Sequence, residues 1–540
     1  MTKVAHHIGL MQKRVDMTGK IERGVVFEMQ LRSKFEVHFL HHGMAQKTPR
    51  PAQSLNHCFH GLFIAAAQGR PETGGGFPVG AGWEEVRFPG LGDEAVYALQ
   101  ISGDSMEPAY RAGDRIIVAP GAEVKPGDRV VLVSENRANW LISDVAIMTT
   151  GAITNPAYIT NTEADHLHTL EASDDVGRIV STKRLGERLL PAAHRADVCK
   201  FVISMEPIEL AQSFSFDLHQ WDDVLAMGQV GHDNMVTMAN SRSIDDTACI
   251  IYTSGTGGAP KGVMLDHAAI ICNCKGAMEA LEPLGLDNNT FLSFLPLSHS
   301  YEHTAGLMFP ITIGAQIYYA EGVDKLVNNM AEVSPTIMTA VPRLYEAIHG
   351  RILHGVEQSG GLKKMMFMRA VTLGRRQLDP AYNLSFLERL QDRVLERLVR
   401  AKVRTRFGGH LKAFVSGGAP LNAEIGSFFL ALGVRILQGY GQTESAPVIS
   451  VNRPVKVKMH TVGPPMKNTH VRIANDGEIL VQGDLVMQGY WRDDDATAQA
   501  IKDGWLHTGD VGHLDDDGYL VITDRKKDII VNSGGYNIAP

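Results

Sequence analysis

The stretch ACIIYTSGTGGAPKGVMLDH, residues 248–267, passes from an apolar strand into a loop of hydroxyls and glycines that a lysine closes. Glycine lets backbone N–H groups approach a polyphosphate closely, because no Cβ intervenes. The hydroxyls add hydrogen-bond donors and the lysine adds positive charge. The order of residues matches neither the Walker loop nor the dinucleotide fingerprint, and the density of donors argues against a plain glycine-rich turn. We therefore predict a phosphate-binding loop formed by Thr253, Ser254, Gly255, Thr256, Gly257, Gly258 and Lys261.

Outward from this loop, apolar strands alternate with helical patterns from about residue 134, which is typical of an α/β architecture. Further segments rich in glycine, hydroxyls and charge lie between the apolar runs. They are LPLSHSYEHTAG (295–306), VSGGAPL (415–421), GYGQTES (439–445), GEILVQGDLVMQGYW (477–491), GWLHTGD (504–510) and DGYLVITDRKKD (517–528). Their joint occurrence in this order is more specific than any one of them.

Over residues 127–540 these segments resemble the adenylate-forming, or AMP-binding, enzymes: acyl-CoA synthetases, luciferases and peptide-synthetase adenylation domains. Two further segments, VSENRANWLISDVAIMTTGAITNPAY (133–158) and VPRLYEAI (341–348), most resemble the long-chain fatty-acid CoA ligases. The resemblance implies an α/β fold, namely the family's large N-terminal domain with stacked α/β subdomains and a small β-rich subdomain.

On this resemblance the chain divides into an AMP-binding core (133–467), a β-rich subdomain (468–525), and a hinge with the start of the C-terminal domain (526–540). The rest of the family's small C-terminal domain, with the lysine that it contributes to the reaction, is absent from the sequence. We therefore expect the turnover of acyl-CoA to be impaired.

The chemistry that the resemblance implies has two steps, with a fatty acid, ATP and coenzyme A as substrates and Mg²⁺ as the metal. The carboxylate attacks the α-phosphate of ATP to give acyl-AMP and pyrophosphate, and the CoA thiol then attacks the acyl carbonyl. Because an anionic oxygen approaches an anionic phosphate, charge neutralisation and alignment matter more than a base. The catalytic residues implied are Lys261, Thr443 and Glu444.

Position within the motifs implies a role for each remaining residue. Thr253 and Glu444 would hold Mg²⁺, and Thr443 would donate to the α-phosphate. The residues around the nucleotide would be Gly418, Gly439 and Tyr440 at the adenine, Asp510 and Arg525 at the ribose, and Lys527 at the hinge.

For the acyl chain, His299, Tyr301 and His303 would lie beside the mouth of the tunnel, with His303 in the place of a bulky gate residue. A hydrogen-bonded histidine of the core is the alternative for both histidines.

Residues 63–132 carry a second resemblance, to the all-β C-terminal peptidase domain of LexA-like and phage repressors. In that family the serine of GDSMEP, here Ser105, is a nucleophile that a later lysine activates. Residues 138–150 contain no lysine, so we expect a vestigial fragment, joined to the ligase-like part by a fusion within residues 126–133. The preceding residues 1–62 are basic and show no sustained period, which predicts a poorly ordered arm.

The net charge of −8 argues against a nucleic-acid partner. Five cysteines without framework spacing, no signal peptide and no apolar run of membrane-spanning length indicate a cytoplasmic protein. Residues 385–407 predict a helix that Gly408 and Gly409 end. Its arginines fit a solvated helix face, and the alternative is peripheral contact with a membrane or an acidic partner.

We therefore expect an ATP-dependent fatty-acid CoA ligase. Two other classes stay open at this point: a self-cleaving repressor fragment, resting on the sequence around Ser105, and a nucleotide-binding protein without catalytic activity.

Overall fold

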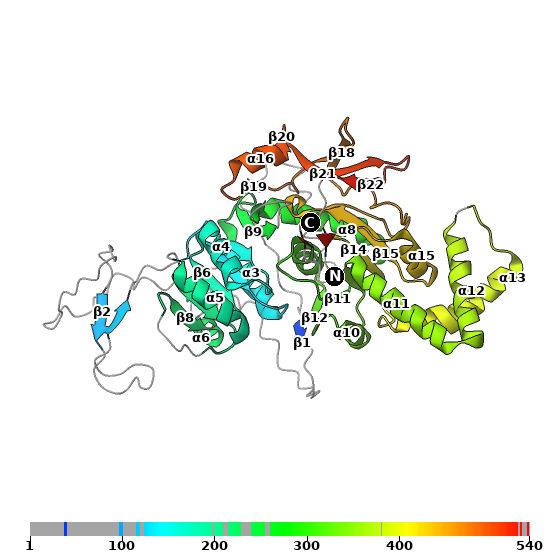
Figure 1. Cartoon of the computed structure of the whole chain (residues 1–540), viewed down its shortest axis with the longest axis horizontal. Coiled ribbons are helices and arrows are strands. Elements are labelled where there is room, and N and C mark those ends of the chain that lie inside the picture. Colours follow the sequence, from blue (N-terminus) through cyan, green and yellow to red (C-terminus); the bar gives the residue numbers. More distant parts are fainter. Residues whose placement is uncertain are drawn as a thin grey trace.

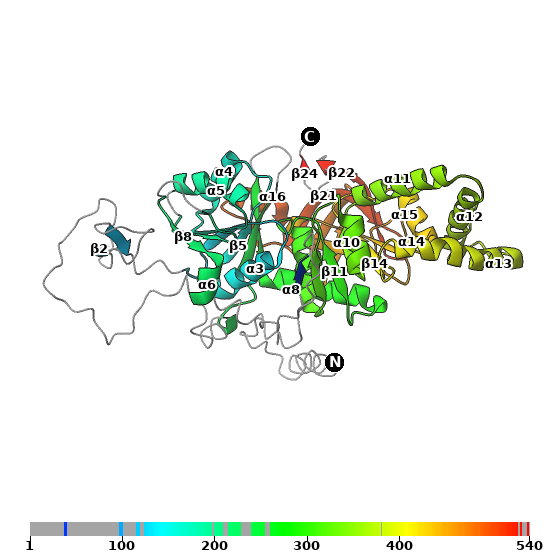
Figure 2. The same cartoon turned by 90° about the horizontal axis from the view of Figure 1, so that it is seen from below.

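In the computed structural model, two large sheets with helices on their faces lie side by side, and a smaller sheet near the C-terminus lies across them (Figures 1 and 2). The residues that the structure describes are 124–196, 199–208, 214–227, 239–253, 260–379 and 381–526, with the backbone of short strands at 37–39, 97–100, 115–118, 530–531 and 537–538.

The first large sheet has eight strands in the order β19-β10-β9-β5-β4-β6-β7-β8. Strands β4 to β9 are parallel, and β10 and β19 continue the sheet antiparallel. Its strands are β4 (Arg129–Val133), β5 (Ile153–Pro156), β6 (Gly177–Val180), β7 (Phe201–Ser204), β8 (Asp217–Gln220), β9 (Thr247–Thr253), β10 (Lys261–Asp266) and β19 (Gly489–Tyr490). The helices between its parallel strands are α3 (Ala138–Thr150), α4 (Glu163–Ser173), α5 (Lys183–Arg195) and α6 (Trp221–Met227). The run RVVLV of β4 is buried from its second residue on, which is typical of a parallel strand covered on both faces.

The second large sheet has seven strands in the order β1-β12-β11-β13-β14-β15-β16, parallel except for β16. Its strands are β1 (Val37–Phe39), β11 (Thr290–Ser293), β12 (Gln316–Tyr319), β13 (Ile337–Ala340), β14 (Ala413–Ser416), β15 (Ile436–Gly441) and β16 (Val448–Val451). The helices before and between its strands are α8 (His267–Leu281), the 3₁₀ turn η1 (Glu282–Leu284), the π-helix η2 (Glu302–Met308), α9 (Phe309–Thr312), α10 (Leu326–Val333), α11 (Pro342–Ser359), α12 (Gly361–Leu378), α13 (Phe386–Leu395), the π-turn η3 (Glu396–Arg400), α14 (Ala401–Thr405), α15 (Ala423–Ala431) and the 3₁₀ turn η4 (Thr443–Ser445).

The third sheet is antiparallel and carries the motifs near the C-terminus. Its elements are β17 (His470–Ile473), β18 (Glu478–Gln482), β20 (Ile501–Lys502), β21 (Trp505–Leu514), β22 (Leu520–Arg525) and the helix α16 (Asp494–Ala500). Two further strand pairs, β2 (Tyr97–Gln100) with β3 (Arg115–Val118) and β23 (Ile530–Val531) with β24 (Asn537–Ile538), are described as backbone.

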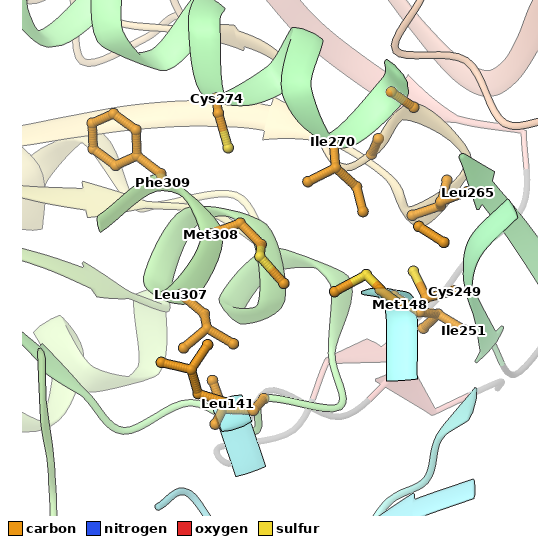
Figure 3. Packing of buried hydrophobic residues seen from close by; sticks show 14 of the residues in the cluster. Leu141, Met148, Cys249, Ile251, Leu265, Ile270, Cys274, Leu307, Met308 and Phe309 are labelled. Atoms are coloured by element: carbon orange, nitrogen blue, oxygen red, sulfur yellow. The ribbon is translucent and has the colours of Figure 1, made fainter. Parts of the chain in front are cut away.

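The largest hydrophobic core joins the two large sheets. Figure 3 shows part of it: residues of α3, β9 and β10 from the first sheet's side meet α8, η2 and α9. Leu141 and Met148 come from α3, while Leu307, Met308 and Phe309 come from η2 and α9. Helices α3 and η2 are therefore packed directly against each other, so a displacement of one helix would disturb the packing of the other.

The helix expected at 385–407 is confirmed, as the consecutive turns of α13, η3 and α14. It begins with a capping box, in which Ser385 and Glu388 satisfy each other's backbone N–H groups. Gly408 and Gly409 end it with φ angles of 84° and 78°, a backbone region that favours glycine.

The α/β fold expected from the sequence is also confirmed. The predicted boundary between residues 132 and 133 falls inside β4, a central strand of the first sheet; the domain limits stay predictions. Residues 1–62 and Ser105 lie outside the described residues apart from the strand at 37–39. Among the helices that the structure describes, none combines the length and the apolar character that a membrane span requires.

Gly374 lets α12 approach the end of α15 closely. A Cβ at this position would lie 2.3 Å from the carbonyl oxygen of Ala431 and 2.7 Å from its Cα, both of them backbone atoms. We expect Gly374→Ala to push the two helices apart and lower the free energy of unfolding by about 1–3 kcal/mol, measured by urea denaturation.

Gly350→Ala provides the matched control, because Gly350 lies in α11 with open space around its missing Cβ. This change should leave stability unchanged or raise it by up to about 1 kcal/mol through helix propensity. Equal effects of the two substitutions would contradict the close approach of α12 and α15.

Candidate active site

The predicted phosphate loop connects two antiparallel strands, β9 and β10. Thr253 ends β9 and Lys261 begins β10, and their Cα atoms are partners in the ladder. Both residues therefore stand at the base of the loop. The loop residues Ser254, Gly255, Thr256, Gly257 and Gly258 lie outside the described part of the chain, as does Lys527.

Lys261 lies at the start of a chain of polar contacts that ends at Glu444. Its Nζ is 5.0 Å from the centre of the Tyr490 ring and 3.9 Å from Oδ2 of Asp493. The Tyr490 hydroxyl donates to Oε1 of Glu444 at 2.9 Å. Burial raises the pKa of the Glu444 carboxyl, and the Tyr490 hydroxyl and Lys261 partly offset this. The predicted catalytic residues Lys261 and Glu444 are thus joined by Tyr490, which the sequence analysis did not single out although it lies in the motif at 477–491.

Thr443 is the first residue of the 3₁₀ turn η4 and directly precedes Glu444. Its hydroxyl is 2.9 Å from the hydroxyl of Ser300, and either group can donate. The turn is held by Asn273 of α8, whose side-chain amide donates to the carbonyl of Ser445 at 3.1 Å and whose carbonyl accepts from the N–H of Val448 at 3.0 Å. Neither Ser300 nor Asn273 was predicted, because both act on residues more than 140 positions away.

The residues predicted at the ribose and one of those predicted at the adenine form a single chain of contacts. The hydroxyl of Tyr440, in β15, donates to Oδ2 of Asp510 at 2.6 Å. Nε of Arg525 lies 2.8 Å from Oδ1 of the same carboxylate, and Asp510 and Arg525 are ladder partners in β21 and β22. Burial and the neighbouring carboxylate raise the pKa of Tyr440. This contact connects the seven-stranded sheet with the C-terminal antiparallel sheet.

The glycines predicted around the adenine lie at the carboxyl ends of β14 and β15. Gly418 has a φ of 80°. A Cβ at Gly439 would lie 3.0 Å from the carbonyl oxygen of Ser450, and one at Gly417 would lie 2.9 Å from the ring of Tyr301. Gly417 and Gly439 therefore allow a close approach of their neighbours, while Gly418 is favoured by its positive φ.

Two of the three residues predicted at the acyl chain line one small pocket of about 10 Å³, which is room for one water-sized group. Its lining residues are Leu295, Pro296, His299, Tyr301, Glu302, Val341 and Gly418. The N–H of Tyr301 donates to Nδ1 of His299 at 3.2 Å, and the Tyr301 hydroxyl donates to the carbonyl of Val415 at 2.8 Å. Burial lowers the pKa of His299 to about 4, so its imidazole is neutral at pH 7.

His303 points away from this pocket. Its Nε2 lies 2.9 Å from Oδ2 of Asp144 in α3, both side chains are fully buried, and its ring meets the edge of Trp140. The alternative stated for it, a hydrogen-bonded histidine of the core, describes this placement. The gate role of His303 and the roles of the other site residues stay predictions.

Glu302 is the residue of this region that the sequence analysis missed. Its carboxylate accepts hydrogen bonds from Ser293 of β11 and Thr339 of β13, each at 2.6 Å. A Cβ at Gly306 would lie 2.4 Å from its carboxyl carbon, so the following turn must leave space for it. Burial raises the pKa of Glu302 to about 7 despite the two hydrogen bonds. The sequence does contain a signal that could have identified it: Glu302 is the one acidic residue in the motif at 295–306.

The motifs at 295–306, 415–421 and 439–445 lie at or just beyond the carboxyl ends of three parallel strands of one sheet, β11, β14 and β15, with β13 between β11 and β14. The carboxyl edge of a parallel sheet is where ligands of open α/β folds bind. Segments far apart in the sequence thus meet at one edge, with Tyr440 reaching Asp510 from there.

Comparison with known proteins shows two families. The profile of the AMP-binding enzyme family matches residues 119–491, and that of the Peptidase S24-like family matches residues 60–141. The chain is 33% identical over 422 residues to the long-chain-fatty-acid–CoA ligase FadD15 of Mycobacterium bovis, covering 77% of this chain and 68% of the relative. It is 31% identical to long chain acyl-CoA synthetase 4 of Arabidopsis thaliana, covering 77% and 65% of the two chains. The chain therefore spans about two thirds of the length of these relatives.

Among solved structures, the anthranilate CoA ligase AuaEII in complex with anthranoyl-AMP resembles this chain with a TM-score of 0.57 at 19% identity, covering 77% of this chain and 71% of the other. At this level of identity the similarity supports the fold, and it agrees with the architecture of the two large sheets.

Glu302 should make the stability of the protein depend on pH. Its pKa of about 7 in the folded protein is above the value of 4.5 for a free glutamate. Between these values the folded state binds more protons than the unfolded state, so this carboxyl lowers stability as the pH rises from 5 to 8. We expect Glu302→Gln to remove that loss, so that the stability of the variant relative to the native protein rises by on the order of 2 kcal/mol over this range.

Urea denaturation at pH 5 and pH 8 measures this difference. Glu171→Gln is the control, since Glu171 lies exposed on α4. If the free energies of unfolding of the native protein and of Glu302→Gln change with pH in the same way, the pKa of Glu302 is not raised in the folded protein.

Proposed function

Because this chain belongs to the AMP-binding enzyme family, we propose that it activates a long-chain fatty acid in two steps. The fatty-acid carboxylate attacks the α-phosphate of ATP, giving acyl-AMP and releasing pyrophosphate. The thiol of coenzyme A then attacks the acyl carbonyl, giving acyl-CoA and releasing AMP. The observation that carries the proposal is the convergence of the motifs at 295–306, 415–421 and 439–445 on one carboxyl edge of the seven-stranded sheet.

Asp510 is suited to bind the ribose. A carboxylate offers about four lone-pair sites, and those of Asp510 accept from Tyr440 and pair with Arg525 in the structure. The remaining sites can accept from the two ribose hydroxyls. Tyr440 and Arg525 fix the orientation of the carboxylate, so the ribose would meet an acceptor that is already in position.

Positive charge near the phosphates comes from Lys261 at the base of the loop. Its side chain is 40% exposed and its nearest carboxylate oxygen, on Asp493, is 3.9 Å away. This leaves the ammonium group able to turn toward a phosphate. Thr443, one turn beyond the edge of the sheet, would donate its hydroxyl to the α-phosphate, with Ser300 fixing its rotamer.

The donor set fits Mg²⁺, which prefers oxygen ligands and is commonly held by one or two carboxylates together with substrate phosphates. Glu444 offers a carboxylate whose pKa is raised by burial, so a nearby cation would favour its ionised form. Thr253 offers a hydroxyl at the start of the loop. When bound, the ion would neutralise charge on the phosphates of ATP.

The pocket beside His299 and Tyr301 has room for one water-sized group, so it would have to widen to admit the carboxyl end of the fatty acid. His299 is neutral at pH 7 and so does not form an ion pair with a carboxylate. Tyr301, fixed by its bond to Val415, would form a wall of the pocket.

The proposal is tested by ATP–pyrophosphate exchange with carboxylic acids from octanoate to palmitate. Exchange reports the formation of acyl-AMP and needs no coenzyme A. We expect exchange that requires both Mg²⁺ and a fatty acid and that is greater with the longer acids. Exchange at the background level with every acid would overturn the proposal.

The role of Asp510 has a separate test. We expect Asp510→Ala to raise the KM for ATP in the exchange assay at least about tenfold, because it removes a charged acceptor of buried hydrogen bonds. Asp516→Ala is the matched control, since Asp516 lies exposed in the turn between β21 and β22. Similar KM values for both variants would exclude ribose binding by Asp510.

A further inference from the structure

Helices α12 and α13 form an arm at one end of the long axis of the molecule, away from the candidate site (Figures 1 and 2). We call residues 361–406, from α12 to the end of the helical run after α13, the helical arm. Arg376 pairs with Glu388 at 2.6 Å and Gln377 donates to Asp392 at 2.9 Å, which holds the two helices together. The arm is therefore a defined structure whose outer surface is fixed.

The base of the arm is anchored by a buried arginine. The guanidinium of Arg400 donates to the carbonyls of Ala431 and Ala370 at 2.8 and 2.9 Å and pairs with Asp392 at 2.7 Å. This side of the arm also contributes Phe367 to the core of the seven-stranded sheet. One side of α12 and the end of the helical run after α13 are thus covered by the protein.

The apolar residues on the other side are exposed. Of the fourteen large apolar side chains that are exposed in the described part of the chain, ten lie between residues 362 and 398. Phe386 is 81% exposed and Leu387 is 68% exposed, and Leu390, Val394 and Leu398 continue their stripe along the helix. A stripe at this spacing normally faces a core. Apolar side chains gathered on an exposed face mark an interaction site.

The charge of the arm is opposite in sign to that of the chain. Residues 361–406 contain twelve Lys and Arg against four Asp and Glu, a net charge of +8, while the chain as a whole carries −8. Two copies of the arm facing each other would repel, which argues against a second copy of this chain as the occupant. Exposed apolar residues among lysines and arginines are typical of helices that lie on an anionic membrane surface.

We propose that the helical arm docks on an anionic lipid bilayer. Phe386, Leu387 and Leu390 would enter the boundary between headgroups and acyl chains, and the surrounding basic residues, including Arg393 and Arg397, would contact the lipid phosphates. The inference rests on the proposed function in one respect: a long-chain fatty acid partitions into bilayers, so docking would bring the enzyme to its substrate.

The test is flotation of the full chain with vesicles of phosphatidylcholine alone and with vesicles that contain about one third phosphatidylglycerol. We expect binding to the phosphatidylglycerol vesicles that weakens as salt is added, since salt screens the basic residues. Absence of binding to the anionic vesicles at low salt would overturn the proposal.

Two variants of the arm locate the contact. Phe386→Gln with Leu387→Gln removes apolar area, and we expect a loss of vesicle affinity of roughly tenfold or more. Arg393→Gln with Arg397→Gln removes two charges, and we expect a loss of roughly fivefold for each. Both pairs are exposed, so the fold should be retained, and circular dichroism checks this.

The controls make equal changes elsewhere. Val323→Gln with Val455→Gln alters two exposed apolar residues outside the arm, and Arg184→Gln with Lys467→Gln removes two exposed charges. The controls should bind vesicles as the native chain does. Unchanged binding by both arm variants would place the contact elsewhere, for example in the basic residues 1–60, and overturn the proposal. A dimer that the arm variants dissociate, without vesicle binding, would overturn it as well.

Vesicle binding is measured without nucleotide, so its outcome is independent of the proposed function. The arm variants should retain pyrophosphate exchange with octanoate supplied in solution. Pyrophosphate exchange without vesicle binding would overturn only the proposal that the arm docks on a bilayer. Vesicle binding without pyrophosphate exchange would overturn only the proposed fatty-acid activation.

Discussion

Two consecutive buried residues, Glu302 and His303, hold the π-helix η2 against both large sheets. The carboxylate of Glu302 accepts from Ser293 and Thr339 in the seven-stranded sheet, and His303 bonds Asp144 in α3, which packs on the eight-stranded sheet. Burying ionisable groups is unfavourable unless each finds a partner. The position of η2 is therefore set by polar contacts as well as by the apolar core in Figure 3. The pocket beside His299 and Tyr301 depends on η2, since both residues lie just before its first residue, Glu302, which also lines the pocket.

The nucleotide side of the candidate site depends on contacts between distant segments. Tyr440 leaves the edge of one sheet and reaches Asp510 in another, while Tyr490 bridges Lys261 and Glu444 from a short strand at the edge of the eight-stranded sheet. In both cases a tyrosine hydroxyl donates to a carboxylate at the border between sheets. Such contacts align the acidic residues before any ligand binds, which is how a protein lowers the cost of orienting its substrates.

The helical arm shows where a pattern in the sequence is insufficient. The spacing of Leu387, Leu390 and Val394 predicts a helix and would ordinarily indicate a face turned to the core. The structure instead buries Arg400, which the pattern groups with the solvated arginines, and leaves these apolar residues exposed. Helical periodicity identifies two faces but does not say which of them the rest of the chain covers.

The sequence by itself determined the α/β fold, the order of the motifs, and the helix at 385–407 with its glycine stop. These features follow from local patterns in the sequence: glycines and hydroxyl side chains gather at the ends of strands, and apolar residues recur at regular intervals along strands and helices. Only the tertiary structure decided that Glu302 lies buried between two strands, that His303 turns to Asp144 instead of the pocket, and that the apolar stripe of the arm faces water. Each of these depends on a partner far away in the chain, and the spacing of neighbouring residues carries no information about such partners.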